Sequence, residues 1–268
     1  MKQLLLAFQF LTIIPVKTNV TLSEADIAGS SSAFVIVGLI QGVLLIATGY
    51  ISGIVFHPDL VAGIILLVLV LSNGGFHLDG LADTFDAIAV KSEGSTDRDI
   101  QKRLSVMKDS SIGPAGVMAI VFALGIKYLS LKNLSHFSFS VYYSSLMLMP
   151  ILPKWTLVLS MFYGRSSRKD GLGKIFINRT GIKEIAISTL SLILLLILIH
   201  VFFNYNTTNS QYFFYAVLLV TMYFLCHAWI RFFNRKFGGL NGDTLGAISE
   251  FTEIIFLLMV LVWSKLSI

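Results

Sequence analysis

The sequence predicts an all-α fold: a polytopic membrane helical bundle of about seven transmembrane helices with an N-terminal interfacial or re-entrant segment. Of its 268 residues, 55% are hydrophobic and 13% are charged, whereas an average soluble domain has roughly 25% charged residues. The apolar residues form long blocks, and a spanning helix needs about 20 of them. This composition excludes a disordered chain and a soluble α/β enzyme, and a single cysteine excludes an intrachain disulfide.

Seven stretches qualify, or come close to qualifying, as membrane spans. In chain order they are 31–56, 59–75, 113–131, 140–162, 185–204, 211–231 and 245–264. Three are irregular: the second runs into Gly74 and Gly75, the fourth is interrupted by Pro150, Pro153 and Lys154, and the seventh carries two glutamates. Breaks and ionisable groups inside a span need partners within the protein, so we expect these three helices to line a site.

The N-terminal run Leu4–Pro15 is apolar but too short to span a membrane. Because Lys2 precedes it, a secretory signal peptide is one interpretation, yet no small-residue cleavage site follows the run. We therefore expect an uncleaved segment that lies at the membrane interface or re-enters the membrane.

Lysine and arginine residues predict the orientation. With the seven crossings above, 16 of the 20 Lys and Arg residues lie on one side of the membrane and three lie on the other. Lys127 is counted among these three because it lies beside an outer loop, and Lys154 lies inside a span. Positive residues favour the cytoplasm, so we expect the N-terminus of the membrane protein inside and its C-terminus outside. Of 15 acidic residues only Asp59 lies outside. This split favours an active site on the cytoplasmic side, although very short outer loops explain it too.

Three aspartates follow the second predicted span. Asp79, Asp83 and Asp86 stand at i, i+4 and i+7, so a helix carries all three on one face. These carboxylates repel one another unless a divalent cation neutralises them, and Mg²⁺ prefers oxygen ligands completed by substrate phosphates. A solvated acidic helix start is the alternative, but it does not explain an aspartate in the third turn. His77 fits a ligand, an acid or base, or a packed interfacial side chain equally well.

The segment Met107–Gly116 leads into the third span. Its Gly/Ser-rich turn offers backbone N–H groups and a helix dipole to an anion, and Lys108 adds a point charge suited to phosphate. Asp109 or Ser110 is equally suited to cap a helix. The pattern leaves phosphate binding and capping equally open.

The segment 238–253 forms a second acidic face. If a helix starts near Asp243, then Asp243, Glu250 and Glu253 fall at i, i+7 and i+10 and share one side. Ionisable groups within a span are costly, so we interpret both glutamates as functional. A structural ion pair with Lys154 or Arg231 is the alternative.

The segment Tyr163–Lys174 is basic and rich in glycine, and on composition alone it matches the positive-inside signal and contact with lipid headgroups. It shares the predicted cytoplasmic face with both acidic clusters. Together they suit metal-assisted chemistry on a phosphate or diphosphate. The sequence contains no nucleophilic triad, P-loop or dinucleotide fingerprint, so we expect direct displacement by a substrate hydroxyl.

Four motifs are more specific together than singly. They are GGFHLDGLADTFD at 74–86, MKDSSIGPAG at 107–116, DGLGKIF at 170–176 and GGLNGDTLGAISE at 238–250, and FQFLTIIPV at 8–16 precedes them. In this order, and along the whole chain, they resemble the cobalamin synthase family, whose members are adenosylcobinamide-GDP ribazoletransferases.

The resemblance implies a reaction and a set of site residues. Adenosylcobinamide-GDP and α-ribazole, or its 5′-phosphate, are joined to give adenosylcobalamin, or its 5′-phosphate, with release of GMP and Mg²⁺ as cofactor. The implied catalytic residues are Asp79, Asp83, Asp86, His77, Asp243 and Glu250. The implied substrate- and phosphate-binding residues are Lys108, Asp109, Ser110, Arg165, Gly171, Gly173 and Asn241. The implied metal ligands are Asp79, Asp83, Asp86, Asp243 and Glu250, with Glu253 a weaker addition.

Two positions depart from the family pattern. Ser111 stands where Arg is usual, which removes a bidentate phosphate contact that Arg103 or Lys102 would have to replace. Asn241 stands where Thr is more usual. Neither change removes a carboxylate, so we expect an active enzyme.

Three other functions are weaker matches. A CDP-alcohol phosphotransferase needs a DxxDG motif, which is absent. A cation transporter needs acids near the midplane on several helices, and a non-catalytic subunit would lack the aspartate cluster. We expect one domain, 1–268, with small-molecule substrates and membrane lipid as partners and no nucleic acid, and we leave a homo-oligomer open.

Overall fold

The computed structural model describes residues 2–15, 22–109, 111–203 and 209–266. These residues form helices and, apart from one isolated bridge, no strand, which confirms the all-α prediction. The helices are α1 (Lys2–Leu11), α2 (Glu24–Gly29), the short 3₁₀ helix η1 (Ser30–Ala33), α3 (Phe34–Gly53), α4 (Pro58–Ser72), α5 (Phe76–Ala89), α6 (Thr96–Val106), α7 (Pro114–Leu134), α8 (Phe139–Tyr163), α9 (Leu172–Arg179), α10 (Ile182–Phe203), α11 (Asn209–Phe237) and α12 (Gly242–Leu266).

The long helices account for the predicted membrane crossings. Among the described residues, six helices are long and apolar enough to cross a membrane, and a seventh crossing results if α4 and α5 count together. These two helices are bent by 86° at a short break, so the predicted span 59–75 is wrong in detail. Helix α4 has only 15 residues, because the chain turns after Ser72.

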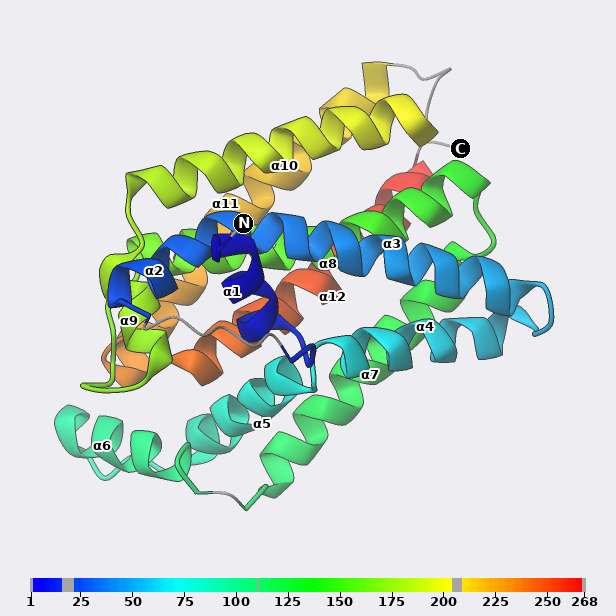
Figure 1. Cartoon of the computed structure of the whole chain (residues 1–268). Helices are drawn as coiled ribbons and strands as arrows, with labels where there is room; N and C mark the ends of the chain where they lie inside the picture. Colours follow the sequence, from blue (N-terminus) through cyan, green and yellow to red (C-terminus); the bar gives the residue numbers. More distant parts are fainter. Residues whose placement is uncertain (1, 16–21, 110, 204–208, 267–268) are drawn as a thin grey trace.

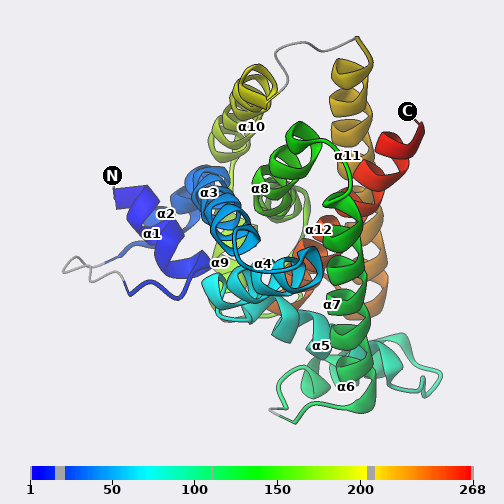
Figure 2. The ribbon, with the colours of Figure 1, turned by 90° about the vertical axis from the view of Figure 1, so that its right-hand side faces the viewer.

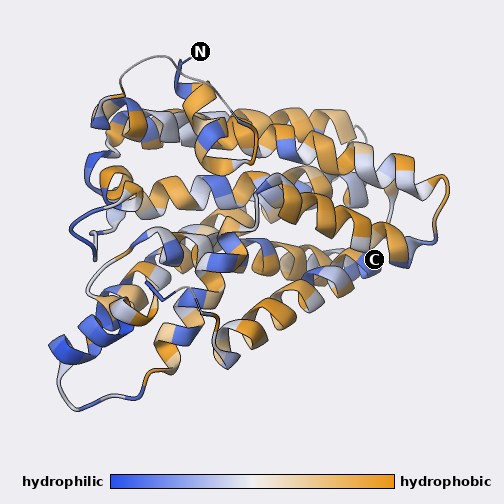
Figure 3. Cartoon of the chain, turned by 60° about the horizontal axis from the view of Figure 1, so that its bottom comes forward, coloured by the Kyte–Doolittle hydropathy of each residue, from blue (hydrophilic) through white to orange (hydrophobic). Residues whose placement is uncertain are grey.

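Successive long helices run in opposite directions (Figure 1). The α3, α7, α10 and α12 helices run away from the end that carries α6 and α9, and the α4–α5 pair, α8 and α11 return to it. Hydrophilic residues gather at that end, which we call the charged end, while the middle of the bundle is apolar (Figure 3). The seven-crossing scheme therefore describes the arrangement of the helices.

Helix α8 lies at the centre of the bundle, among α3, α10, α11 and α12 (Figure 2). It continues through Pro150 and Pro153, so the predicted interruption of this span is wrong. On α3, Gly38 and Gly42 let the two backbones approach closely, because a Cβ on Gly38 would lie 2.8 Å from the Pro150 carbonyl oxygen. Close packing thus holds the helix together at the point where the prolines remove backbone hydrogen bonds.

The N-terminal segment does not cross the bundle. Helix α1 has ten residues and packs Leu6 and Ala7 against η1 and α3. The segment continues to the bend between α4 and α5, where the Ile13 N–H donates to the Ser72 carbonyl over 3.3 Å. The N-terminal residues therefore support the turn that orients α5.

Candidate active site at the charged end of the bundle

Helix α5 carries the three predicted aspartates and begins at a sharp turn. Gly74 and Gly75 have φ values of +66° and +73°, a left-handed conformation that glycine adopts without strain. The helix then runs unbroken from Phe76 to Ala89, so Asp79, Asp83 and Asp86 have the helical spacing that the sequence predicted.

Two glycines bring α5 against the start of α12. A Cβ on Gly80 would lie 2.7 Å from the Asp243 carbonyl oxygen, and a Cβ on Gly246 would lie 3.1 Å from the His77 carbonyl oxygen. Only residues without side chains allow this separation. The two predicted acidic faces therefore meet where α12 begins.

Three of the predicted carboxylates form one cluster at this contact, which we call the acidic cluster: Asp79, Asp83 and Asp243. Asp83 is close enough to Asp79 and Asp243 to interact with both charges, and Asp243 interacts with Asp79. Within the described part of the chain, the carboxylates of Asp79 and Asp83 accept no hydrogen bond and form no ion pair. Like charges in this arrangement repel one another and favour a bound cation.

Arg168 supplies positive charge to the acidic cluster, although its role was missed in the sequence. Its Nη2 atom lies 2.7 Å from Asp243 Oδ2. The loop that carries Arg168 is held against the loop before α12, because the Leu240 N–H donates to the Arg165 carbonyl (2.7 Å) and the Ser167 N–H to the Leu240 carbonyl (2.8 Å). The basic sequence around Arg168 was the available signal, but its partner lies 75 residues away.

Asp86 interacts with the charge of Asp83 but also has hydrogen-bond partners outside the acidic cluster. Its two carboxylate oxygens accept hydrogen bonds from the N–H groups of Gly113 (2.7 Å) and Gly116 (2.8 Å), at the start of α7. This is the arrangement of a helix cap supplied from another helix. Asp86 therefore fixes α5 to α7, and its role as a metal ligand stays a prediction.

The segment before α7 carries the predicted phosphate-binding residues. The Asp109 carboxylate accepts hydrogen bonds from the N–H (3.0 Å) and hydroxyl (2.7 Å) of Ser111. These bonds hold the pKa of Asp109 below its usual range. Lys108 is exposed, and Ser110 lies outside the described residues. Ser111 thus orders the turn.

The remaining predicted binding residues surround the start of α12. Asn241 is buried, and its Oδ1 accepts the Thr244 N–H (2.9 Å) as a helix cap. Gly171 precedes α9 with φ +91°, and a Cβ on Gly173 would lie 2.9 Å from the Gly242 nitrogen. Arg165 is exposed. These positions shape the loops around the acidic cluster.

Glu250 and Glu253 lie deeper in the bundle than Asp243, about 10 Å or more along α12. Lys127 Nζ lies 2.5 Å from Glu250 Oε2 and also bonds Glu253 Oε2. Lys127 is fully buried in α7, so its assignment beside an outer loop is wrong. The predicted second acidic face is thus divided: Asp243 lies in the acidic cluster, and Glu250 and Glu253 lie beside Lys127.

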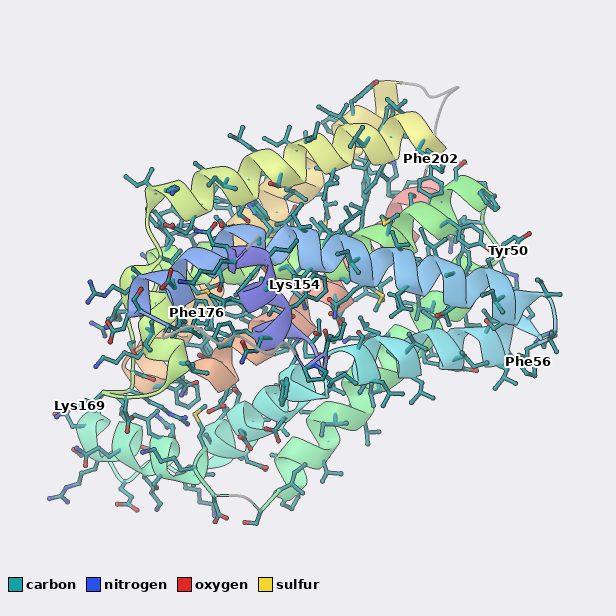
Figure 4. The ribbon with its side chains drawn as sticks, in the orientation of Figure 1. Tyr50, Phe56, Lys154, Lys169, Phe176 and Phe202 are labelled. Carbon is teal, nitrogen blue, oxygen red and sulfur yellow. The ribbon has the colours of Figure 1, made fainter. Side chains whose placement is uncertain are left out.

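Lys154 completes this buried ionic group, which we call the core cluster: Lys127, Lys154, Glu250 and Glu253. Lys154 lies in the interior (Figure 4). It is fully buried, interacts with both glutamates, and its Nζ has no hydrogen-bond partner in the described structure. Two positive and two negative charges balance in the apolar core. In the sequence, the apolar residues on both sides of each lysine were the sign that it lies inside a span and needs a partner there.

His77 joins the two regions. Its Nδ1 lies 3.1 Å from the Ser249 hydroxyl, and it lines a cavity of about 10 Å³ together with Lys127, Glu250 and Glu253. Ligand atoms of His77 and the two glutamates lie within 4.8 Å of one another, a spacing that suits a metal ion. Lys127 and Lys154 together already neutralise those two carboxylates, however, so the acidic cluster is the better candidate for a divalent cation.

Comparisons with known proteins cover nearly the whole chain. The profile of the family described as cobalamin-5-phosphate synthase matches residues 3–261. An adenosylcobinamide-GDP ribazoletransferase of Thermodesulfovibrio yellowstonii is 34% identical over 262 residues, which are 98% of this chain and 96% of that protein. A protein of the same name from Clostridium tetani is 31% identical over 255 residues, 95% of this chain and 94% of the relative. No solved structure matches the chain.

Proposed function

The chain belongs to the cobalamin-5-phosphate synthase family, and from this premise we propose how its charged end joins adenosylcobinamide-GDP to α-ribazole or its 5′-phosphate. It is a membrane transferase of cobalamin biosynthesis that forms adenosylcobalamin, or its 5′-phosphate, and releases GMP. A ribazole hydroxyl attacks the phosphorus next to the cobinamide. The bond between that phosphorus and the GMP oxygen breaks, and the hydroxyl proton passes to a base.

The acidic cluster is the observation that carries the proposed site. Asp79, Asp83 and Asp243 come from two helices and interact with one another's charges, and among the described residues Arg168 is the basic group paired with them. A carboxylate of this cluster is the base for the hydroxyl proton, because it lies among oxygens that a phosphate ester must approach. Arg168 is close enough to bind a phosphate oxygen while it remains beside Asp243.

The residues of the acidic cluster fit Mg²⁺. The donors are carboxylate oxygens, the ligands that Mg²⁺ prefers, and their mutual repulsion is relieved by a divalent charge. When bound, Mg²⁺ neutralises the negative charge that grows on the departing GMP. The chain's own residues hold the diphosphate against the base and keep the attacking hydroxyl in line.

The same proposal includes the membrane arrangement. The apolar helices make the chain a multi-pass membrane protein. The excess of Lys and Arg in the loops of the charged end supports a cytoplasmic location for that end and for the active site. We infer one domain, 1–268, in a prokaryotic inner membrane, with lipid around the apolar surface and corrinoid substrates at the charged end.

A GMP-release assay tests the proposed function. Protein in nanodiscs receives adenosylcobinamide-GDP and α-ribazole, with or without Mg²⁺, and GMP and cobalamin are measured. We expect Mg²⁺-dependent product from the wild type and about 100-fold less from Asp83→Asn. Asp59→Asn is the matched control at the opposite end, where Asp59 pairs with Lys132 and His57 on the surface. No product from folded wild type, with either form of ribazole, would contradict the function.

A further inference from the structure

An apolar pocket of about 180 Å³ opens next to the acidic cluster. Its walls come from α1, α3, α5, α8, α9 and α12. Phe76 and Leu172 line it and are 59% and 51% exposed, whereas Leu157 and Met161 are buried. The pocket therefore has buried apolar residues at its base and is open to the surface at the other end, the usual form of a site for a small ligand.

Aromatic rings dominate the inner wall. Phe176 makes an edge-to-face contact with Phe10, with ring centroids 5.3 Å apart and planes at 89°, and its centroid lies 5.5 Å from that of Phe34. Phe34 and Phe176 are buried, so these rings keep their positions without a ligand. Phe176 lies in the interior near the charged end, whose surface is marked by Lys169 (Figure 4). Such a wall favours a planar aromatic ring.

The pocket is lined by residues of the two segments that carry the acidic cluster. Two of its lining residues, His77 and Gly242, stand close in the chain to Asp79 and Asp243. His77 is the only polar side chain among the lining residues that the structure describes, and its bond to Ser249 fixes the orientation of its ring. A ligand with a flat apolar end and a polar end would thus place the polar end at the acidic cluster.

We propose that this pocket binds the bicyclic aromatic base of ribazole and thereby directs the ribose toward the acidic cluster. The inference rests on the proposed function and adds the subsite for one substrate. The pocket accommodates a bicyclic base but is too small for a corrin ring. The aromatic rings bind the base by stacking or edge contacts, and His77 meets a ring nitrogen or the sugar.

A pocket-narrowing variant tests this assignment. Gly242 is exposed at the mouth, and a Cβ there would meet no atom within 4 Å, so Gly242→Val adds bulk without displacing protein. Two ribazoles are compared, one with 5,6-dimethylbenzimidazole and one with unsubstituted benzimidazole. We expect Gly242→Val to raise KM about tenfold for the dimethyl substrate and clearly less for the smaller one, while KM for adenosylcobinamide-GDP changes less than twofold.

A control variant outside the pocket and a second variant inside it accompany this test. Gly125→Val is the matched control, because a Cβ on this glycine in α7 also meets no atom within 4 Å, and it should leave every KM unchanged. Phe176→Leu should raise KM for both ribazoles severalfold, with thermal unfolding measured to show that the variant is folded.

For Gly242→Val, equal changes for the two ribazoles, a change mainly in KM for adenosylcobinamide-GDP, or no change would each overturn the assignment. An unchanged KM would indicate a lipid chain as the occupant. Since wild-type GMP release is measured in the same assay, failure of this inference is distinct from failure of the proposed function.

Discussion

Asp83 and Asp86 lie one turn apart on the same face of α5, yet their surroundings give them different roles. Asp83 faces the charges of Asp79 and Asp243 and accepts no hydrogen bond in the described structure. Asp86 accepts two N–H groups at the start of α7. One carboxylate is thus available to a ligand, whereas the other is already used to join two helices.

Alanine at each of these two positions should therefore have different effects on stability. Asp86→Ala leaves the N–H groups of Gly113 and Gly116 without their acceptor, so we expect the free energy of unfolding to fall by about 2 kcal/mol. Asp83→Ala removes repulsion, so stability should stay within about 0.5 kcal/mol or rise, while activity is lost. Denaturation in detergent measures both, and a larger loss for Asp83→Ala than for Asp86→Ala would contradict this account.

The sequence predicted the shared face of these aspartates but not their division of roles. The spacing of Asp79, Asp83 and Asp86 depends only on helix geometry, which is local. The partner of Asp86 lies 27 residues away and that of Asp243 lies 75 residues away. Such pairings follow from how the helices pack, which a single sequence does not specify.

At the scale of elements, the contact between α5 and α12 assembles the site. It depends on Gly80 facing the Asp243 backbone and Gly246 facing the His77 backbone. The bend at Gly74 and Gly75 turns α5 by 86° from α4 and directs it toward α12. Small residues at these points allow the two acidic faces to meet.

Gly80→Ala should force the two helices apart. Its Cβ would lie 2.7 Å and 2.9 Å from backbone atoms of Asp243, which cannot yield as a flexible side chain would. We expect a loss of activity of at least about tenfold and a loss of stability of about 1–3 kcal/mol. GMP release and thermal unfolding measure these effects. Gly53→Ala is the control, since its Cβ would meet no atom within 4 Å, and equal behaviour of the two variants would argue against the contact.

The sequence predicted where most helices lie, but not where α4 ends or that α8 is continuous. The expected span 59–75 becomes a short helix and a bend, because the left-handed glycines end it at Ser72. The expected break at Pro150 and Pro153 becomes a continuous α8, because tight packing against α3 supports the helix there. Glycine and proline mark irregular points in a sequence, but tertiary contacts decide whether the helix bends.

At the scale of the whole molecule, the core cluster joins three helices inside the membrane. Lys127 on α7, Lys154 on α8 and the glutamates of α12 are all buried, and their formal charges sum to zero. The sequence indicated Lys154 or Arg231 as a partner for these glutamates but not Lys127, which stands in an apolar stretch of α7. Charge balance in the core depends on helices that meet only in the folded bundle.

Lys127→Met should be strongly destabilising. It leaves Glu250 and Glu253 with Lys154 alone, so the core carries a net negative charge, and we expect a loss of about 3–5 kcal/mol. The double variant Lys127→Met/Glu250→Gln restores neutrality and should be more stable than Lys127→Met. Denaturation of the wild type, the two single variants Lys127→Met and Glu250→Gln, and the double variant provides the measurement. Simple additivity of the two single changes would show that the charges are not coupled.

The orientation of the molecule predicts which positions an impermeant thiol reagent reaches. Cys226 is buried, so the native chain should stay unlabelled in intact cells and provides the control. His57→Cys, at the end opposite the charged end, should be labelled in intact cells. Lys169→Cys, in the basic loop, should be labelled only after permeabilisation. The reverse pattern would place the active site outside the cell.

The most direct test of the central claim is metal binding by the acidic cluster. Mn²⁺, a substitute for Mg²⁺, is titrated into purified protein and followed by electron paramagnetic resonance, with wild type, Asp83→Asn and Asp59→Asn compared. We expect one bound Mn²⁺ in the wild type and in Asp59→Asn, displaced by Mg²⁺, and at least about tenfold weaker binding in Asp83→Asn. Equal Mn²⁺ affinity in all three proteins, or no bound Mn²⁺ in the folded wild type with substrates present, would contradict the proposed site.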